Sequence, residues 1–195
     1  MGNKDARRKP RALFPLLLAG VAATLLAAAL WNAVRAREAT AVAPTGVEGT
    51  RTGDTAPDFR LVDVTGRVDT RPTLLAGGKP GLLFFTATWC LPCVEGLREL
   101  HRFQQEVGSE RFRVLIVFVD PRETDEDLRT YRDRYGFPGS WFFAADRDRM
   151  VLRYRVRFLD TKFLLDPQGV IRWTDVYPAT YQTWRRALAV VGVGR

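Results

Sequence analysis

Trp89-Cys90-Leu91-Pro92-Cys93 holds both cysteines of this 195-residue chain. The apolar run Leu82-Leu83-Phe84-Phe85 precedes it, and residues 94–107, which follow it, place apolar side chains at helical spacing. Two thiols separated by two residues, where a strand gives way to a helix, can close a disulfide and open it again. The stretch therefore predicts a redox-active dithiol.

The position of each cysteine predicts its role. Cys90 should lie at the N-terminal end of the helix, where the helix dipole and unpaired backbone N–H groups favour an anion. We therefore expect a lowered pKa for its thiol and an attacking thiolate, while Cys93, one turn on, resolves the mixed disulfide. Pro92 fits the first helical turn, where a missing N–H costs little, and Trp89 should flank the sulfur. By their spacing alone, the two cysteines could also form an inert bridge or bind a metal.

The remainder of the chain alternates between strand and helix patterns. Continuous apolar runs predict buried strands at 82–86 and 114–119, and Thr124 with Asp127 forms a capping box for a helix that ends near Gly136. Further elements are expected at 141–144 (strand), 146–154 (helix), 163–165 and 170–174 (a hairpin) and 178–191 (helix). This order predicts an α/β fold in which a mixed central β-sheet is flanked by helices.

The N-terminal part carries a candidate membrane anchor. Residues 12–34 contain no charge and are long enough to cross a bilayer, which needs about 20 apolar residues. Residues 1–11 hold five basic side chains and one acid, so the positive-inside rule keeps this tail in the cytoplasm. We expect a single-pass signal-anchor helix in the cell membrane, a mobile linker at 35–56 and an extracytoplasmic domain at 57–195. A cleaved signal peptide is the alternative, because Ala41-Val42-Ala43 resembles a cleavage site.

Charge and residue counts exclude several classes of protein. The net charge is +8, but residues 57–195 hold 22 basic and 18 acidic side chains with no basic block, so we expect no nucleic-acid partner. Two cysteines and one histidine are too few for a zinc ribbon, and we expect neither a metal nor a cofactor. Arg153, Arg155 and Arg157 alternate with apolar residues, which predicts either a strip for an acidic partner or an ordinary solvated face.

This order of elements, with a dithiol at a strand-to-helix turn, resembles the thioredoxin fold. The chain is most similar to the membrane-anchored thiol-disulfide oxidoreductases of the TlpA-like and ResA-like type, over about residues 53–192. Besides 86–93, the similarity is carried by Gly53-Asp54-Thr55-Ala56-Pro57-Asp58-Phe59, by Gly78-Lys79-Pro80 and by Phe163-Leu164-Leu165-Asp166-Pro167-Gln168-Gly169. The resemblance implies an enzyme that reduces a disulfide-containing protein client, with cytochrome c maturation as its setting and a membrane protein as its electron donor.

Asp160 departs from the family pattern. The family usually has a cis-proline in the loop that faces the dithiol, and here that place falls on Asp160 in Phe158-Leu159-Asp160-Thr161. A cis bond before a residue other than proline costs about 2.5–4 kcal/mol, so we expect a trans loop. By the resemblance, Asp160 and Thr161 join Trp89 and Pro92 in docking the client, and the extra carboxylate disfavours a thiolate opposite it. The alternative is a one-residue shift in the alignment, with Asp160 exposed on a loop.

Phe84 is the second departure. Thioredoxins keep a buried acid six residues before the first cysteine, where it takes a proton from the second cysteine, and Phe84 occupies that place here. Glu95, Asp160 or water must then accept the proton from Cys93. We favour Asp160, because a glutamate one turn into a helix is usually solvated.

Two other functions compete with this one. Val119-Asp120-Pro121 and the turn at 166–169 are similar to segments of the Sco-type copper chaperones, and two thiolates can hold Cu(I). Those proteins, however, separate their cysteines by three residues and supply a histidine, whereas residues 150–170 contain none. A peroxidase of the peroxiredoxin type is disfavoured, because Leu83 and Ala87 stand where that family needs a proline and a threonine.

Overall fold

The computed structural model describes residues 26–27 and 42–194. Nearly all of the predicted anchor at 12–34, and the whole of the tail at 1–11, lie outside the described residues. Among the residues that are described, no helix is long and apolar enough to span a membrane. A compact unit begins at Val42 and contains the dithiol.

A five-stranded mixed sheet forms the centre of this unit, in the order β5-β4-β3-β6-β7. The strands are β3 (Gly81–Thr86), β4 (Arg113–Phe118), β5 (Phe142–Ala145), β6 (Thr161–Leu165) and β7 (Ile171–Asp175). β3, β4 and β5 are parallel, whereas β6 is antiparallel to both β3 and β7. All six residues of β3 are buried, as a central strand covered on both faces requires. The predicted mixed sheet is therefore confirmed.

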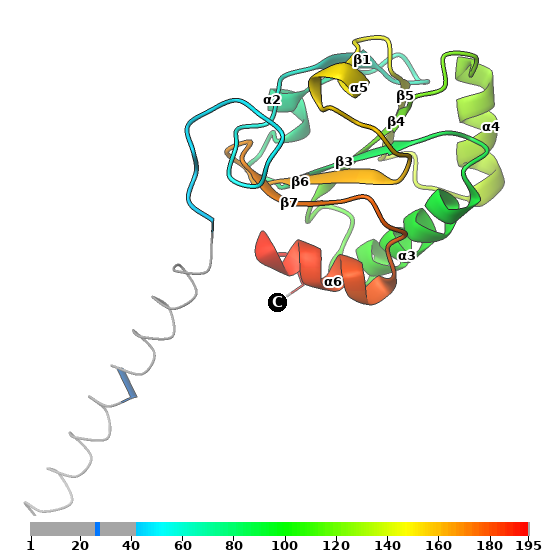
Figure 1. The fold of residues 1–195 in the computed structure, drawn as a ribbon. Helices are drawn as coiled ribbons and strands as arrows, with labels where there is room; N and C mark the ends of the chain where they lie inside the picture. The colour runs from blue at the N-terminus through cyan, green and yellow to red at the C-terminus, as the bar shows by residue number, and fades with distance from the viewer. Residues whose placement is uncertain (1–25, 28–41, 195) are drawn as a thin grey trace, which may run out of the picture. The chain divides into compact units, whose positions relative to one another are not determined.

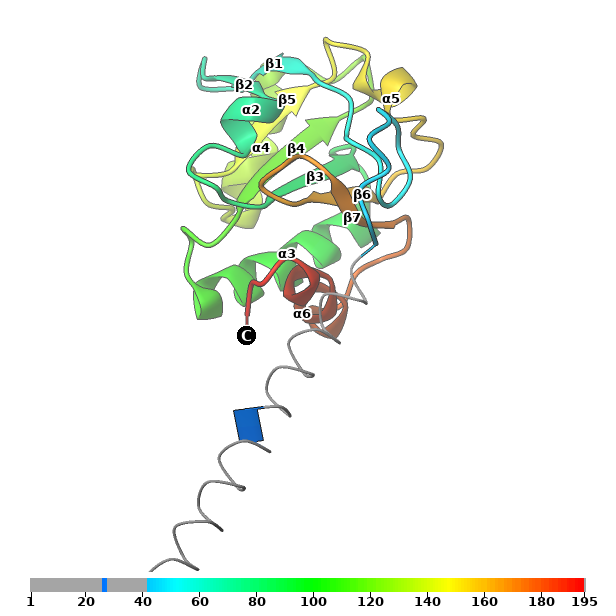
Figure 2. The same ribbon diagram turned by 90° about the vertical axis from the view of Figure 1, so that its left-hand side faces the viewer.

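Helices cover both faces of the sheet (Figure 1). One face packs against α3 (Leu91–Val107), α4 (Asp125–Tyr135) and α6 (Tyr181–Val190), and Figure 2 shows α3 and α6 side by side. The opposite face packs against α2 (Arg71–Leu74), α5 (Met150–Arg153) and the hairpin of β1 (Arg60–Val62) and β2 (Val68–Thr70). The dithiol thus lies on the α3 side of the sheet.

Local hydrogen bonds set the ends of the helices. The Thr124 hydroxyl accepts from the Asp127 N–H and the Asp127 carboxylate accepts from the Thr124 N–H, which confirms the predicted capping box of α4. The prediction of a helix at 146–154 is wrong for residues 146–149, which are not helical. Arg149 adopts a left-handed φ of 54°, and the Asp146 carboxylate accepts from the Met150 N–H at 2.7 Å, so the helix begins only at Met150.

The segment 42–56 belongs to the folded unit, although we expected a mobile linker up to residue 56. The Gly53 N–H donates to Ile171 O at 2.8 Å, and the Ile171 N–H donates to Asp54 O at 2.9 Å. These bonds join the segment to the start of β7. Asp54 is also buried, and its carboxylate accepts from the Thr45 hydroxyl at 2.9 Å. The domain therefore begins about residue 42 rather than at 57.

Candidate active site

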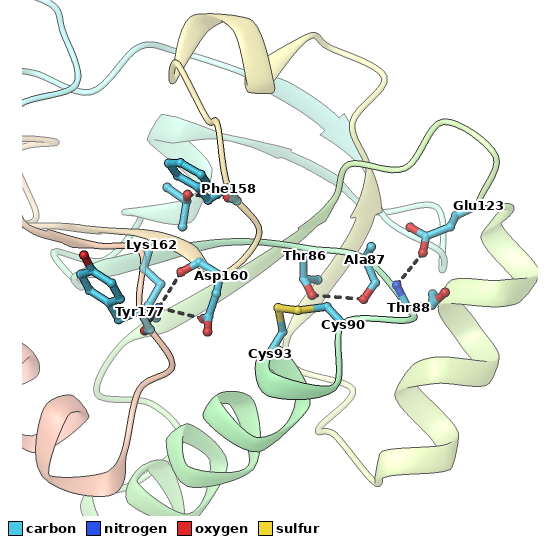
Figure 3. Close-up of a disulfide and its surroundings, with 11 residues drawn as sticks. Thr86, Ala87, Thr88, Cys90, Cys93, Glu123, Phe158, Asp160, Lys162 and Tyr177 are labelled. Atoms are coloured by element: carbon cyan, nitrogen blue, oxygen red, sulfur yellow. Dashed lines mark hydrogen bonds and ion pairs between the residues drawn. A yellow bond between two sulfur atoms is a disulfide. The ribbon is translucent and has the colours of Figure 1, made fainter.

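The two cysteines form a disulfide across the first turn of α3 (Figure 3). Their Cα atoms are 5.3 Å apart, within the usual range of about 4.4–6.8 Å. Cys90 is the N-cap of α3 and Cys93 is its third residue, which confirms the predicted position of the dithiol at the start of the helix. The Cys90 N–H donates to Ala87 O at 3.0 Å, which fixes the turn between β3 and α3.

The two sulfur-bearing residues differ in exposure. Cys90 is 8% exposed and Cys93 is fully buried. Trp89 and Leu91, which flank Cys90, are 62% and 67% exposed, and Pro92 is also exposed. The first turn of α3 contains no acidic residue, so its N–H groups and dipole are free to stabilise a thiolate on Cys90. A client can therefore reach Cys90 but not Cys93.

Side chains of the loop after β4 form hydrogen bonds with the two residues that precede Cys90. Because β3 and β4 are parallel, their carboxyl ends meet at the same edge of the sheet. There the Thr88 N–H donates to the Glu123 carboxylate, and Trp89 Nε1 donates to Asp120 Oδ2 at 3.1 Å. Burial raises the pKa of Glu123, whereas hydrogen bonds from Arg122 lower the pKa of Asp120. Sequence reasoning did not predict these two contacts, because only the strand pairing brings the loops together.

Asp160 lies in the loop before β6, beside the end of β3. Its N–H donates to Phe85 O at 2.9 Å, its φ is 67°, and its side chain is buried, with 4% of the residue exposed. This burial excludes the alternative in which Asp160 lies on an exposed loop. Every peptide bond in the described residues is trans, as expected.

The expected docking roles of Asp160 and Thr161 are limited by their burial. Thr161 is also only 4% exposed, and its hydroxyl donates inward to Phe158 O at 2.7 Å. A client could therefore meet the backbone of this loop, or the 66% exposed Phe158, but not these two side chains.

Lys162 is a buried cation that sequence reasoning missed. It is 0% exposed, and its Nζ lies 2.7 Å from Asp160 Oδ1 and donates to Tyr177 O at 2.7 Å (Figure 3). In the register of β3 and β6 it stands opposite Phe84, and Nζ is 5.3 Å from the centre of that ring. Its signal in the sequence is a lysine directly before the apolar run Phe163-Leu164-Leu165.

Burial controls the protonation of this ion pair. It raises the pKa of the Asp160 carboxyl, and the neighbouring Lys162 ammonium opposes the rise. Burial likewise lowers the pKa of Lys162. A carboxyl group with a raised pKa exchanges its proton closer to neutral pH, which suits acid–base chemistry.

The Asp160 carboxylate faces α3 one turn beyond Cys93. A Cβ atom added to Gly96 would lie 3.5 Å from Ala179 N and 4.0 Å from Asp160 Oδ1, so the carboxylate lies beside this turn of α3 together with the backbone of Ala179. Glu95, the other carboxylate considered as a proton acceptor, is exposed and forms an ion pair with Arg98 at 2.7 Å. Of these two, only Asp160 is buried between the sheet and α3.

The side chains around the dithiol also bear on metal binding. Within the part of the chain that the structure describes, no three side chains of cysteine, histidine, aspartate or glutamate gather to hold a metal ion. The Sco-type interpretation therefore gains no structural observation in its favour.

Comparison with known proteins gives a consistent result. The AhpC/TSA family matches residues 52–174. The chain is 35% identical over 166 residues to the thiol-disulfide oxidoreductase ResA of Geobacillus thermodenitrificans (strain NG80-2), which covers 80% of this chain and 84% of the relative. It is 30% identical over 134 residues to the thioredoxin-like protein YneN of Bacillus subtilis (strain 168), covering 68% of this chain and 74% of the relative.

The fold of the chain is also similar to a solved structure. The crystal structure assigned to a thiol:disulfide interchange protein DsbE of Chlorobium tepidum superposes with a TM-score of 0.61 at 25% sequence identity. The match covers 75% of this chain and 100% of that one. The order of elements around the Cys90–Cys93 disulfide is thus that of a thioredoxin-like fold.

Proposed function

The chain belongs to the AhpC/TSA family of thioredoxin-like proteins and is a thiol-disulfide oxidoreductase, and from this premise we propose that it is a membrane-tethered reductant of protein disulfides. The observation that carries the proposal is the asymmetry of the dithiol. Cys90 reaches the surface at the N-terminus of α3, whereas Cys93 is buried one turn on. This arrangement supports attack by Cys90 and resolution by Cys93.

The reaction has two thiol–disulfide exchange steps. The Cys90 thiolate attacks one sulfur of the client disulfide, a Cys90–client disulfide forms, and the other client sulfur leaves as a thiolate. The Cys93 thiolate then attacks Cys90 Sγ, which forms the Cys90–Cys93 disulfide and releases the second client sulfur. Two electrons and two protons pass from the protein to the client in each cycle. A membrane protein with a dithiol then reduces the Cys90–Cys93 disulfide for the next cycle.

Asp160 takes the proton that Cys93 must lose before the second step. Its carboxylate is buried against α3 near Gly96, and burial raises its pKa. Lys162 Nζ lies 2.7 Å from Asp160 Oδ1 and holds the carboxylate in place. The role falls to Asp160 because Phe84 occupies the strand position of the thioredoxin acid and Glu95 is solvated.

The tether and its orientation rest on the sequence alone. Residues 12–34 are uncharged, and basic residues precede them, which supports a cytoplasmic N-terminus and an extracytoplasmic domain. Fractionation of cells that express the full chain tests this proposal. The protein should sediment with membranes, and external protease should cleave the domain in cells without an outer barrier. A released domain in the culture fluid would indicate a cleaved signal peptide instead.

For the client, we propose the disulfide of apocytochrome c, which must be reduced before haem attachment. This choice rests on the resemblance to the ResA-like oxidoreductases. Cells in which Cys90→Ser replaces the native protein should lose covalently bound haem in cytochrome c, and an added thiol reductant should restore it. Unchanged haem attachment would exclude this client.

The reductase activity itself is tested by turnover. The full-length protein, supplied with a dithiol donor, should reduce insulin and the small neutral compound 2-hydroxyethyl disulfide. Cys90→Ser should abolish both reactions. An equal rate for wild type, variant and donor alone would reject the proposed function.

A further inference from the structure

A basic groove lies beside the loop that carries Asp160. It has a volume of about 250 Å³, and the side chains that matter here are Arg155, Arg157, Phe158, Thr174 and Val176. This volume is below the roughly 300–1,000 Å³ of sites that enclose small molecules, so the groove suits a few side chains of a peptide.

The groove carries an uncompensated positive charge. Arg153, the first arginine of the sequence strip, is neutralised by an ion pair with Asp148. Arg155 and Arg157 are exposed, and neither forms an ion pair with any described residue. Both line the groove, and no carboxylate does. Two free guanidinium groups in one concavity attract and orient carboxylates.

One loop, which carries Phe158 and Asp160, connects the groove to the redox site. Phe158, which lines the groove, directly follows Arg157 and is 66% exposed. The Thr161 hydroxyl fixes Phe158 O at 2.7 Å, and Figure 3 shows Phe158 and Asp160 in the loop beside the disulfide. A client cysteine bonded to Cys90 would therefore have its neighbouring residues within reach of the groove.

The wall formed by β7 favours an extended ligand. β7 is the last strand in the order of the sheet, and Thr174 of β7 and Val176, directly after β7, line the groove. Beyond Ile171, no strand in the described part of the chain pairs with this edge. Such an edge can accept an extended peptide.

We propose that this groove binds an extended acidic segment of the client protein, next to the cysteine that Cys90 attacks. The proposal rests on the reductase function proposed above and defines its substrate class. Acidic residues of the client would pair with Arg155 and Arg157, while its cysteine lies among the exposed side chains of Trp89, Leu91 and Phe158. These charge pairs should act mainly by speeding the association of the client with the protein at low ionic strength.

The test uses matched disulfide peptides flanked by glutamates, glutamines or lysines, with full-length protein. Wild type should reduce the acidic peptide with a kcat/KM roughly 3- to 10-fold above the basic one at low salt, as expected for two exposed charge pairs. The double variant R155E/R157E should reverse this order. R111E/R186E, which changes the same net charge on surfaces outside the groove, should keep it. Turnover of 2-hydroxyethyl disulfide should be equal in all three proteins.

Each outcome decides the proposal. Equal rates for the three peptides in wild type, or a preference that survives in R155E/R157E, would overturn it. A preference lost equally in both double variants would assign it to overall charge and also reject the groove. If wild type reduces neither the peptides nor 2-hydroxyethyl disulfide, the reductase function fails, and the groove proposal fails with it.

Discussion

Asp160 and Lys162 form an ion pair behind the dithiol, with 2.7 Å between carboxylate oxygen and ammonium nitrogen. Asp160 is 4% exposed and Lys162 is 0% exposed. Lys162 lies opposite Phe84, which occupies the strand position where thioredoxins have a buried acid. Here the buried acid is Asp160, in the loop before β6. Because both charged side chains are buried, substitution of either should change the free energy of unfolding and the pH dependence of catalysis.

Removal of the lysine alone should destabilise the protein. In Lys162→Met the Asp160 carboxylate stays buried without its cation, and the expected loss of unfolding free energy is about 3 kcal/mol. Burial without the cation raises the folded-state pKa of Asp160 further, so the loss should grow as the pH rises through that pKa and shrink in acid. Urea denaturation measures this loss.

The matched control is Asp160→Asn/Lys162→Met. It removes both charges, so it should recover most of the stability lost in the single variant. A double variant as unstable as Lys162→Met would show that the lysine stabilises the fold by packing rather than by pairing.

The resolving step should depend on the protonation of Asp160. Only the carboxylate form can accept a proton from Cys93, and burial raises the pKa of Asp160 above its ordinary 3.8. The rate should therefore rise with pH through this raised pKa. In Asp160→Asn the rise should disappear, and the step should slow by about 100-fold. Stopped-flow tryptophan fluorescence of a single turnover measures it.

Glu95→Gln is the control for this pH profile. Glu95 is exposed and pairs with Arg98, so its loss should leave the profile unchanged. If Asp160→Asn and wild type give the same profile, another group or water accepts the proton.

Gly96 should tolerate alanine but not a large side chain. An added Cβ would lie 3.5 Å from Ala179 N and 4.0 Å from Asp160 Oδ1, which are ordinary contacts. Gly96→Ala should therefore stabilise α3 by up to about 1 kcal/mol. Gly96→Leu should overfill the space beside Asp160 and cost about 1–3 kcal/mol. Thermal unfolding compares the two, and equal stability would contradict the close approach of the loop to the helix.

Glu123 should position the turn before Cys90. Glu123→Ala removes the acceptor of the Thr88 N–H, so the attacking residue should lose alignment and kcat/KM should fall about 10-fold. Glu123→Gln keeps an acceptor oxygen and should retain most of the activity. A similar loss in both variants would instead assign the effect to the charge of Glu123.

The sequence predicted the elements that follow from local patterns. The buried strands β3 and β4, the capping box at Thr124 and the dithiol at the start of α3 depend on residues close together in the chain. The resemblance predicts that Asp160 lies opposite the dithiol. It does not predict that Asp160 is buried, because the burial depends on the pairing of β6 with β3.

Contacts between distant segments were not predictable in this way. Lys162 finds its partners only when β6 lies beside β3, and Glu123 reaches Thr88 only through the parallel pairing of β3 and β4. Residues 42–56 have the composition of a linker, yet hydrogen bonds to β7 order them. In each case tertiary hydrogen bonding decided what local propensity left open.

Mass spectrometry of trapped complexes tests the roles of the two cysteines most directly. A reduced single-cysteine variant is mixed with a disulfide-containing client, and the mass of the complex that accumulates is measured. Reduced full-length Cys93→Ala should accumulate one client molecule joined to Cys90, because no second thiol releases it. Cys90→Ala should accumulate none, since Cys93 is fully buried. A client trapped on Cys93 in Cys90→Ala, or no mixed disulfide in Cys93→Ala, would contradict the assignment.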